Sequence, residues 1–130
     1  MPDAFDPFMK PWAGSRRAEL VKAYVAVDDG DPLGAGVALV ALVFAPPEEQ
    51  WAFILELIAA APDDERVLSR IAAGPVEGLL GRFGDLAVPW IEARAASDQR
   101  FRRVLRGVWQ HTMSDEVWAR VCAARDRTDA

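Results

Sequence analysis

Residues that start or stop helices recur at short intervals along the chain, and this spacing constrains the fold more than any other feature. Proline, glycine and acidic residues cluster at 28–32, 46–49, 62–64, 74–75 and 84–85, with short apolar stretches between them. Proline in a first turn and carboxylates near a helix N-terminus both favour helix starts. No Asn-Gly or Asp-Gly turn is flanked by alternating strands. The pattern predicts an all-α fold, an irregular bundle of about eight short helices, with a short solenoid of helix pairs as the alternative.

The expected helices can be placed from their caps. They begin near Ser15, Pro32, Pro47, Asp64, Pro75, Asp85, Asp98 and Ser114. Gly84 is expected to end the helix that starts at Pro75, as glycine commonly does. Residues 34–44 are apolar nearly all round and contain two glycines and several valines, so a strand is the open alternative to a helix there.

The clearest amphipathic helix is expected over 98–109. Its apolar positions follow the i, i+3, i+4, i+7, i+8 spacing of a helix face, and arginines take the opposite face. The apolar positions are Phe101, Val104, Leu105, Val108 and Trp109, and the arginines are Arg102, Arg103 and Arg106. We expect Leu55, Leu80, Leu105 and Trp109 to share one core, with Trp51, Trp90 and Trp118 also on inner faces.

A length of 130 residues suits one domain, expected over 15–130, with an irregular apolar arm at 1–14. The arm carries Phe5, Phe8 and Trp12, and either packs over the core or docks on a partner. The one cysteine, Cys122, allows no internal disulfide, and residues 1–14 lack the basic start and apolar stretch of an export signal. These features predict a cytoplasmic protein. The abundance of alanine, and of arginine over lysine, is typical of a GC-rich bacterial genome.

The net charge argues against two classes of partner, nucleic acids and anionic membranes. The chain carries −5 overall, but residues 1–66 hold 12 acidic and 5 basic side chains, hence −7, and residues 67–130 hold 8 acidic and 10 basic, hence +2. The overall acidity argues against binding to nucleic acid or an anionic membrane. The apolar segment 33–44 is too short for a hydrocarbon layer of about 30 Å.

No cluster of residues demands a particular chemistry. The single histidine, His111, lacks the companions of a metal site, and Cys122 is expected to be a buried, inert thiol. Glu77 and Glu92 are conceivable as an acid and base pair, although helix-end stabilisation and arginine pairing explain them as well. The sequence therefore predicts no catalytic residue, no metal ligand and no cofactor.

A family resemblance rests on the run Ile71-Ala72-Ala73-Gly74-Pro75-Val76-Glu77-Gly78-Leu79-Leu80, followed by Gly84, Ile91-Glu92, Phe101, Leu105 and Val108-Trp109. This pattern resembles a family of short bacterial proteins of unknown function, DUF6869, over roughly residues 47 to 122. The resemblance implies a compact helical domain. It implies no activity, substrate or cofactor.

By elimination, the sequence favours a non-catalytic protein–protein interaction module. The expected partner-binding residues are Arg102, Arg103 and Arg106, together with Phe5, Phe8 and Trp12 of the arm. The partner is another protein or a second copy of the chain, because the acidic first half complements the arginines. One alternative is an enzyme with a carboxylate site at Glu77 and Glu92. The other is nucleic-acid binding through the arginine face.

Overall fold

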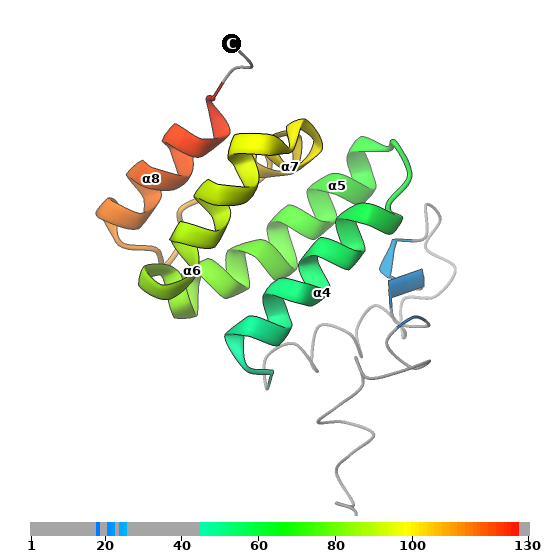
Figure 1. The fold of residues 1–130 in the computed structure, drawn as a ribbon, viewed down its shortest axis with the longest axis horizontal. Coiled ribbons are helices and arrows are strands. Elements are labelled where there is room, and N and C mark those ends of the chain that lie inside the picture. The colour runs from blue at the N-terminus through cyan, green and yellow to red at the C-terminus, as the bar shows by residue number, and fades with distance from the viewer. Residues whose placement is uncertain (1–17, 19–20, 23, 26–44, 128–130) are drawn as a thin grey trace, which may run out of the picture. The chain divides into compact units, whose positions relative to one another are not determined.

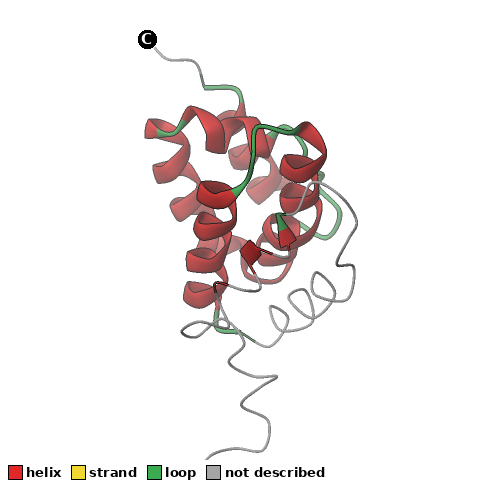
Figure 2. Cartoon of the chain, turned by 90° about the vertical axis from the view of Figure 1, so that its right-hand side faces the viewer, coloured by secondary structure: helices red, strands yellow, loops and turns green. Residues whose placement is uncertain are grey.

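The computed structural model describes residues 18, 21–22, 24–25 and 45–127. The chain divides into two compact units, residues 1–67 and 68–130. The described helices are α4 (Pro47–Ala60), α5 (Glu65–Ile71), the π-helix η1 (Ala72–Val76), α6 (Glu77–Ser97), α7 (Gln99–Leu105) and α8 (Asp115–Arg125) (Figure 1). These residues contain no strand (Figure 2), so the predicted all-α class is confirmed for them. The arm at 1–14 and the ambiguous segment 34–44 lie outside the described residues.

In the first unit, α4 begins at the predicted proline and acidic start. Pro46 is its N-cap, and Glu48 and Glu49 lie in the first turn. Its buried residues are Gln50, Phe53, Ile54, Leu57 and Ile58. Trp51 and Leu55, predicted on the inner face, are only half-buried, so that face is wrong by a rotation about the helix axis. The rotation places Gln50 inside, where its amide donates a hydrogen bond to the carbonyl of Ala45 at 2.8 Å.

The predicted break at 74–75 does not occur. The chain is helical without interruption from α5 through η1 into α6, and Pro75 is buried inside η1. A proline lacks the N–H of a regular helix and its ring collides with the preceding turn. The wider π turn accommodates it, and the N–H of Glu77 bonds back to the carbonyl of Ala72, five residues earlier.

The predicted break at Gly84 is present one residue earlier, as a kink within α6. Phe83 has non-helical dihedrals (φ −130°, ψ 34°), and α6 continues beyond it to Ser97 with Pro89 in its interior. Six helices were expected within residues 45–127, where the helical segments are 47–60, 65–97 with a kink at Phe83, 99–105 and 115–125. The count of about eight short helices is therefore too high here, because the break predicted at 74–75 is absent and the one predicted at Gly84 is a kink rather than a separation.

In the second unit, the main packing partners are α6 and α8. Gly84 allows their close approach, since a Cβ there would lie 3.2 Å from both γ-carbons of Val117. The predicted caps are confirmed, because Asp98 accepts from the N–H of Phe101 and Ser114 accepts from the N–H of Val117. The fully buried side chains of this unit include Leu79, Leu80, Ile91, Phe101 and Leu105.

Helix α7 ends at Leu105, four residues before the end of the predicted helix. The next three amides bond three residues back, Arg106 to Arg103, Gly107 to Val104 and Val108 to Leu105. Such bonds tighten a last turn into 3₁₀ geometry. Gly107 also lies against η1, where a Cβ would be 3.1 Å from that of Ala72. The helix therefore ends next to Gly107, whose lack of a side chain permits close contact with η1.

Candidate functional site

The segment from Arg106 to Ser114, which joins α7 to α8, is the most distinctive surface of the second unit. We call it the α7–α8 loop. Trp109 is 70% exposed, although Val108 and Met113 on either side of it are buried. Among the described residues, the other large apolar side chain with high exposure is Leu86, at 48%. The loop is thus anchored at two points and presents an indole to solvent between them.

Glu77, the first residue of α6, contacts this loop twice. One carboxylate oxygen, Oε2, accepts the backbone N–H of Trp109 at 3.3 Å. The other, Oε1, lies 2.9 Å from Nε2 of His111. The Glu77 side chain is only 9% exposed, whereas that of His111 is 66% exposed. A nearly buried carboxylate therefore holds a solvent-facing imidazole.

His111 has an unusual backbone. Its φ is 42°, and no other non-glycine residue in the described part of the chain has a positive φ. It occupies the second position of a turn closed by the bond from the N–H of Met113 to the carbonyl of Gln110, at 2.8 Å. Turns with a positive φ at that position favour glycine or asparagine. The Gln110 amide secures the same turn through Met113 and Asp115.

The loop lies close to α6. A Cβ at Gly81 would be 2.6 Å from Oγ1 of Thr112, nearer than real Cβ atoms come to other atoms. Glycine at this position therefore leaves room for the Thr112 side chain against α6. Gly81 and Glu77 lie four residues apart, on one side of the helix.

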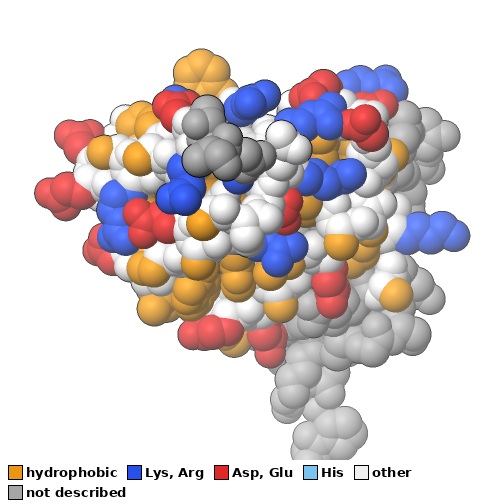
Figure 3. Space-filling view, turned by 45° about the horizontal axis from the view of Figure 1, so that its top comes forward, with side chains coloured by type: hydrophobic (Ala, Val, Ile, Leu, Met, Phe, Trp, Pro, Cys, Tyr) orange, Lys and Arg blue, Asp and Glu red, His pale blue; other side chains and the backbone are white. Residues whose placement is uncertain are grey.

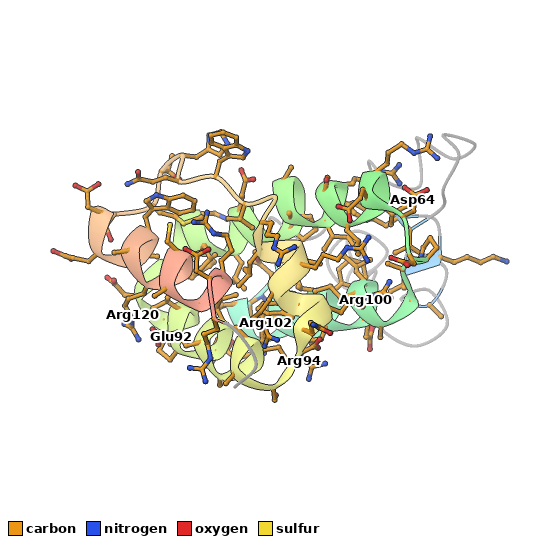
Figure 4. The ribbon with its side chains drawn as sticks, turned by 90° about the horizontal axis from the view of Figure 1, so that it is seen from above. Asp64, Glu92, Arg94, Arg100, Arg102 and Arg120 are labelled. Atoms are coloured by element: carbon orange, nitrogen blue, oxygen red, sulfur yellow. The ribbon has the colours of Figure 1, made fainter. Side chains whose placement is uncertain are left out.

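The two glutamates of α6 have opposite electrostatic environments. Burial raises the pKa of Glu77, and the Trp109 N–H and the charge of His111 oppose that rise only in part. Hydrogen bonds from Arg120 lower the pKa of Glu92. Arg120 Nε donates to Glu92 Oε2 at 2.9 Å, and a second guanidinium nitrogen bonds the other oxygen. Figure 4 shows Glu92 beside Arg120 of α8.

Each predicted carboxylate is thus held by a different basic side chain. Glu77 bonds to the loop, Glu92 bonds to α8, and they do not share a site. His111, which was expected to lack the companions of a metal site, has one carboxylate neighbour in Glu77. Cys122 is a free, half-buried thiol rather than a fully buried one.

The predicted arginine face is wrong at Arg102. This side chain is 5% exposed, and its Nη1 donates to the carbonyl of Ala95 at 2.6 Å (Figure 4). Every position opposite the apolar stripe was expected to face solvent. Arg102 instead reaches the C-terminal turn of α6, so its place on the helix face did not predict its burial. Arg106 is exposed and Arg103 half-buried. Phe5, Phe8 and Trp12 lie outside the described residues.

The placement of Trp109 in the core is also wrong, because α7 ends at Leu105 and, of the two apolar positions beyond it, Val108 is buried but Trp109 is not. Gly107 was the signal in the sequence that could have shortened the predicted helix, since glycine disfavours a helix interior. The pairing of Glu77 with the loop had no sequence signal, because the two are 32 residues apart.

Two further observations limit the site. Across the described ranges, no three His, Cys, Asp or Glu side chains form a group that could hold a metal ion. No helix in this part of the chain combines the length and apolar character needed to cross a membrane.

Over the described residues the chain is helical, and its α7–α8 loop presents an exposed indole. The profile of DUF6869, a family of unknown function, matches residues 35–129. The chain therefore belongs to this family, as its central motif indicated. Searches among curated proteins and among solved structures found no match.

Proposed function

We propose that this protein is a non-catalytic interaction module that self-associates, with Trp109 of the α7–α8 loop as the anchor of the contact. The observation that carries the proposal is the 70% exposure of Trp109 on a loop in which Val108 and Met113 are buried. Tryptophan buries about 150–250 Å² and is enriched among the residues that dominate binding energy. An ordered loop also loses little conformational entropy on binding.

Charge supports a second copy of the chain as the partner. The two units contain the same charged residues as the two parts of the sequence counted above. The first unit therefore carries −7 and the second +2. Arg103 of α7 and Arg106 at the start of the loop would complement the negative charge of the first unit of another copy, and a two-fold axis would make that contact twice. Positive and negative side chains are interspersed on the face in Figure 3, so charge alone would give little affinity. The indole supplies the apolar area that such a contact needs.

The test is solution mass by light scattering over a range of protein concentrations. Wild type should dimerise, and Trp109→Ala should weaken the dimer by about tenfold or more, as expected for an anchor residue. Arg103→Glu with Arg106→Glu should weaken it at low salt. Arg102 is left unchanged because it is buried. Leu86→Ala is the matched control, an exposed apolar residue outside the loop, and should leave the dimer intact.

A wild-type chain that stays monomeric at millimolar concentration would overturn self-association. Steeply salt-dependent retention on heparin, lost in the double arginine variant, would instead favour the nucleic-acid alternative. The enzymatic alternative receives no support from Glu77 and Glu92, which bond to different partners. A cytoplasmic location stays a prediction from the single cysteine.

A further inference from the structure

Glu77 and His111 form a carboxylate–imidazole pair in which one member is buried and the other faces solvent. Oε1 of Glu77 lies 2.9 Å from Nε2 of His111. The glutamate side chain is 9% exposed and the histidine side chain 66% exposed. The contact proposed above uses the indole of Trp109 and leaves this pair without a role.

The contact with Glu77 decides which nitrogen of the His111 ring can react. A neutral imidazole carries a proton on one nitrogen and a lone pair on the other, and a hydrogen bond made by the first fixes this arrangement. When Glu77 is ionised, the proton belongs on Nε2, which faces the carboxylate. The lone pair is then on Nδ1, at the edge of the ring turned away from Glu77. Because most of the side chain is exposed, Nδ1 is a nucleophile within reach of a small molecule.

The same carboxylate stabilises the ring after it has reacted. An imidazole that forms a bond through Nδ1 and keeps its proton on Nε2 gains a positive charge. Glu77 places a negative charge next to Nε2, as the carboxylate of a catalytic triad does for its histidine. Burial raises the pKa of Glu77, which makes the carboxylate a stronger acceptor for the Nε2 proton.

The backbone restrains the ring as well. His111 has a φ of 42°, in the left-handed region that is uncommon for a residue other than glycine. Such conformations persist where surrounding contacts specify them, and they cluster at functional sites. Here the bond from the N–H of Met113 to the carbonyl of Gln110 and the contact with Glu77 specify it. The imidazole is therefore exposed but held in place.

We propose that His111 is a phosphoryl acceptor, whose Nδ1 takes the phosphoryl group of a small acyl phosphate. The Nδ1 lone pair forms the new bond to phosphorus, and the bond from phosphorus to the acyl oxygen of the donor breaks. That oxygen leaves with the electron pair as a free carboxylate. The proton stays on Nε2, where Glu77 balances the charge of the ring. The donor supplies its own leaving group, so the chain has to provide only the nucleophile and the counter-charge.

This inference goes beyond the proposed self-association and does not depend on it. A phosphoryl group on His111 would add negative charge to the α7–α8 loop, two residues from Trp109. A chain that is phosphorylated but stays monomeric would keep the acceptor site and remove self-association.

The test is incubation of the full chain with acetyl phosphate, followed by intact-mass measurement and phosphorus NMR. His111 is the only histidine, so phosphohistidine can form at one residue alone. Wild type should gain one phosphoryl group that survives alkali and is released by acid, as expected for a bond from phosphorus to an imidazole nitrogen. NMR should place this group on Nδ1. A chain that gains no phosphohistidine would overturn the proposal.

Glu77→Gln separates the pair from an ordinary surface imidazole. Its neutral amide cannot balance the charge of the ring, so phosphorylation should slow by about tenfold or more. Glu92→Gln is the matched control, on the same helix but bonded to Arg120, and should react like wild type. His111→Gln should form no phosphohistidine. Equal rates in wild type and Glu77→Gln would overturn the proposal.

Wild type alone decides if Glu77→Gln fails to fold. Its rate should then be compared with that of the same chain unfolded in urea, in which Glu77 no longer holds the ring. A faster reaction of the folded chain, at Nδ1, would support the acceptor site. The same rate in both states, or a phosphoryl group on Nε2 of the folded chain, would overturn it.

Discussion

Helix α7 and the loop that follows it share one apolar pattern but differ in burial. In α7, Leu105 is fully buried, and even the charged Arg102 is 5% exposed. The two positions of the same stripe beyond Leu105 differ, since Val108 is 3% exposed and Trp109 is 70% exposed. Periodicity therefore predicted burial correctly within the helix and at Val108, but not at Trp109.

The physical cause of the difference is the end of the helix. After Leu105 the backbone tightens into 3₁₀-type bonds, and Gly107 lies close to η1. The side chains that follow no longer advance by about 100° per residue around a helix axis. Their spacing in the sequence therefore no longer indicates which side chains share one face. Substitutions on the two sides of this boundary can test the comparison.

The largest contrast is expected between two arginines. Arg102→Glu should lower the free energy of unfolding by about 3–5 kcal/mol, because it places an unpaired carboxylate beside the carbonyl of Ala95. Arg106→Glu, at an exposed position, should change it by less than about 0.5 kcal/mol. Urea unfolding followed by circular dichroism measures both. Equal effects would mean that Arg102 is as solvated as the sequence suggested.

The second contrast concerns the apolar stripe. Leu105→Ala should cost about 2–5 kcal/mol, the usual range for a buried leucine. Trp109→Ala should cost less than about 1 kcal/mol, since most of its surface is already in water. The same urea experiment applies, and a cost for Trp109 comparable to that for Leu105 would show that the indole belongs to the core.

A third experiment tests the role of Gly107 at the boundary. Gly107→Ala should destabilise by about 1–2 kcal/mol, because its new Cβ would meet that of Ala72 at 3.1 Å. Gly78→Ala in α6 is the control, since the nearest atom to its Cβ is a mobile guanidinium at 3.4 Å, and alanine should stabilise that helix by up to about 1 kcal/mol. Thermal unfolding of both variants separates close packing from helix propensity. Stabilisation by Gly107→Ala would contradict this account of the helix end.

The smallest effects are expected in pH dependence, and their signs are opposite. The raised pKa of Glu77 means that its contribution to stability is largest below the ordinary pKa of glutamate and is lost as pH rises through the raised value. The lowered pKa of Glu92 means that its contribution is present above the ordinary value and is lost as pH falls through the lowered one.

Relative to Glu77→Gln, wild type should therefore lose stability as pH rises through this region. Relative to Glu92→Gln, it should gain stability. Urea midpoints measured at a series of pH values give both differences. Parallel curves for wild type and Glu77→Gln would show that Glu77 is solvated in the folded chain.

Local signals predicted the described secondary structure well wherever a cap decided it. The starts at Pro47, Asp98 and Ser114 are confirmed because each depends on groups within one turn of the chain. The break expected at Pro75 failed because a π turn can accommodate a proline, and no local pattern in the sequence separated the two outcomes. The sequence analysis considered the three residues of the candidate site separately. It assigned Trp109 to the core, and it did not predict that Glu77 contacts His111 or the Trp109 backbone.

The sequence by itself determined the helical class, the caps and the family, because these follow from propensities and motifs that extend over a few residues. Only the tertiary structure decided that Arg102 is buried, that α7 ends before Trp109, and that Glu77 holds the loop. Each of these depends on what a second segment, distant along the chain, places beside the residue. Burial and the contacts of a charged side chain are properties of that assembled environment, and the spacing of residues along one helix does not contain them.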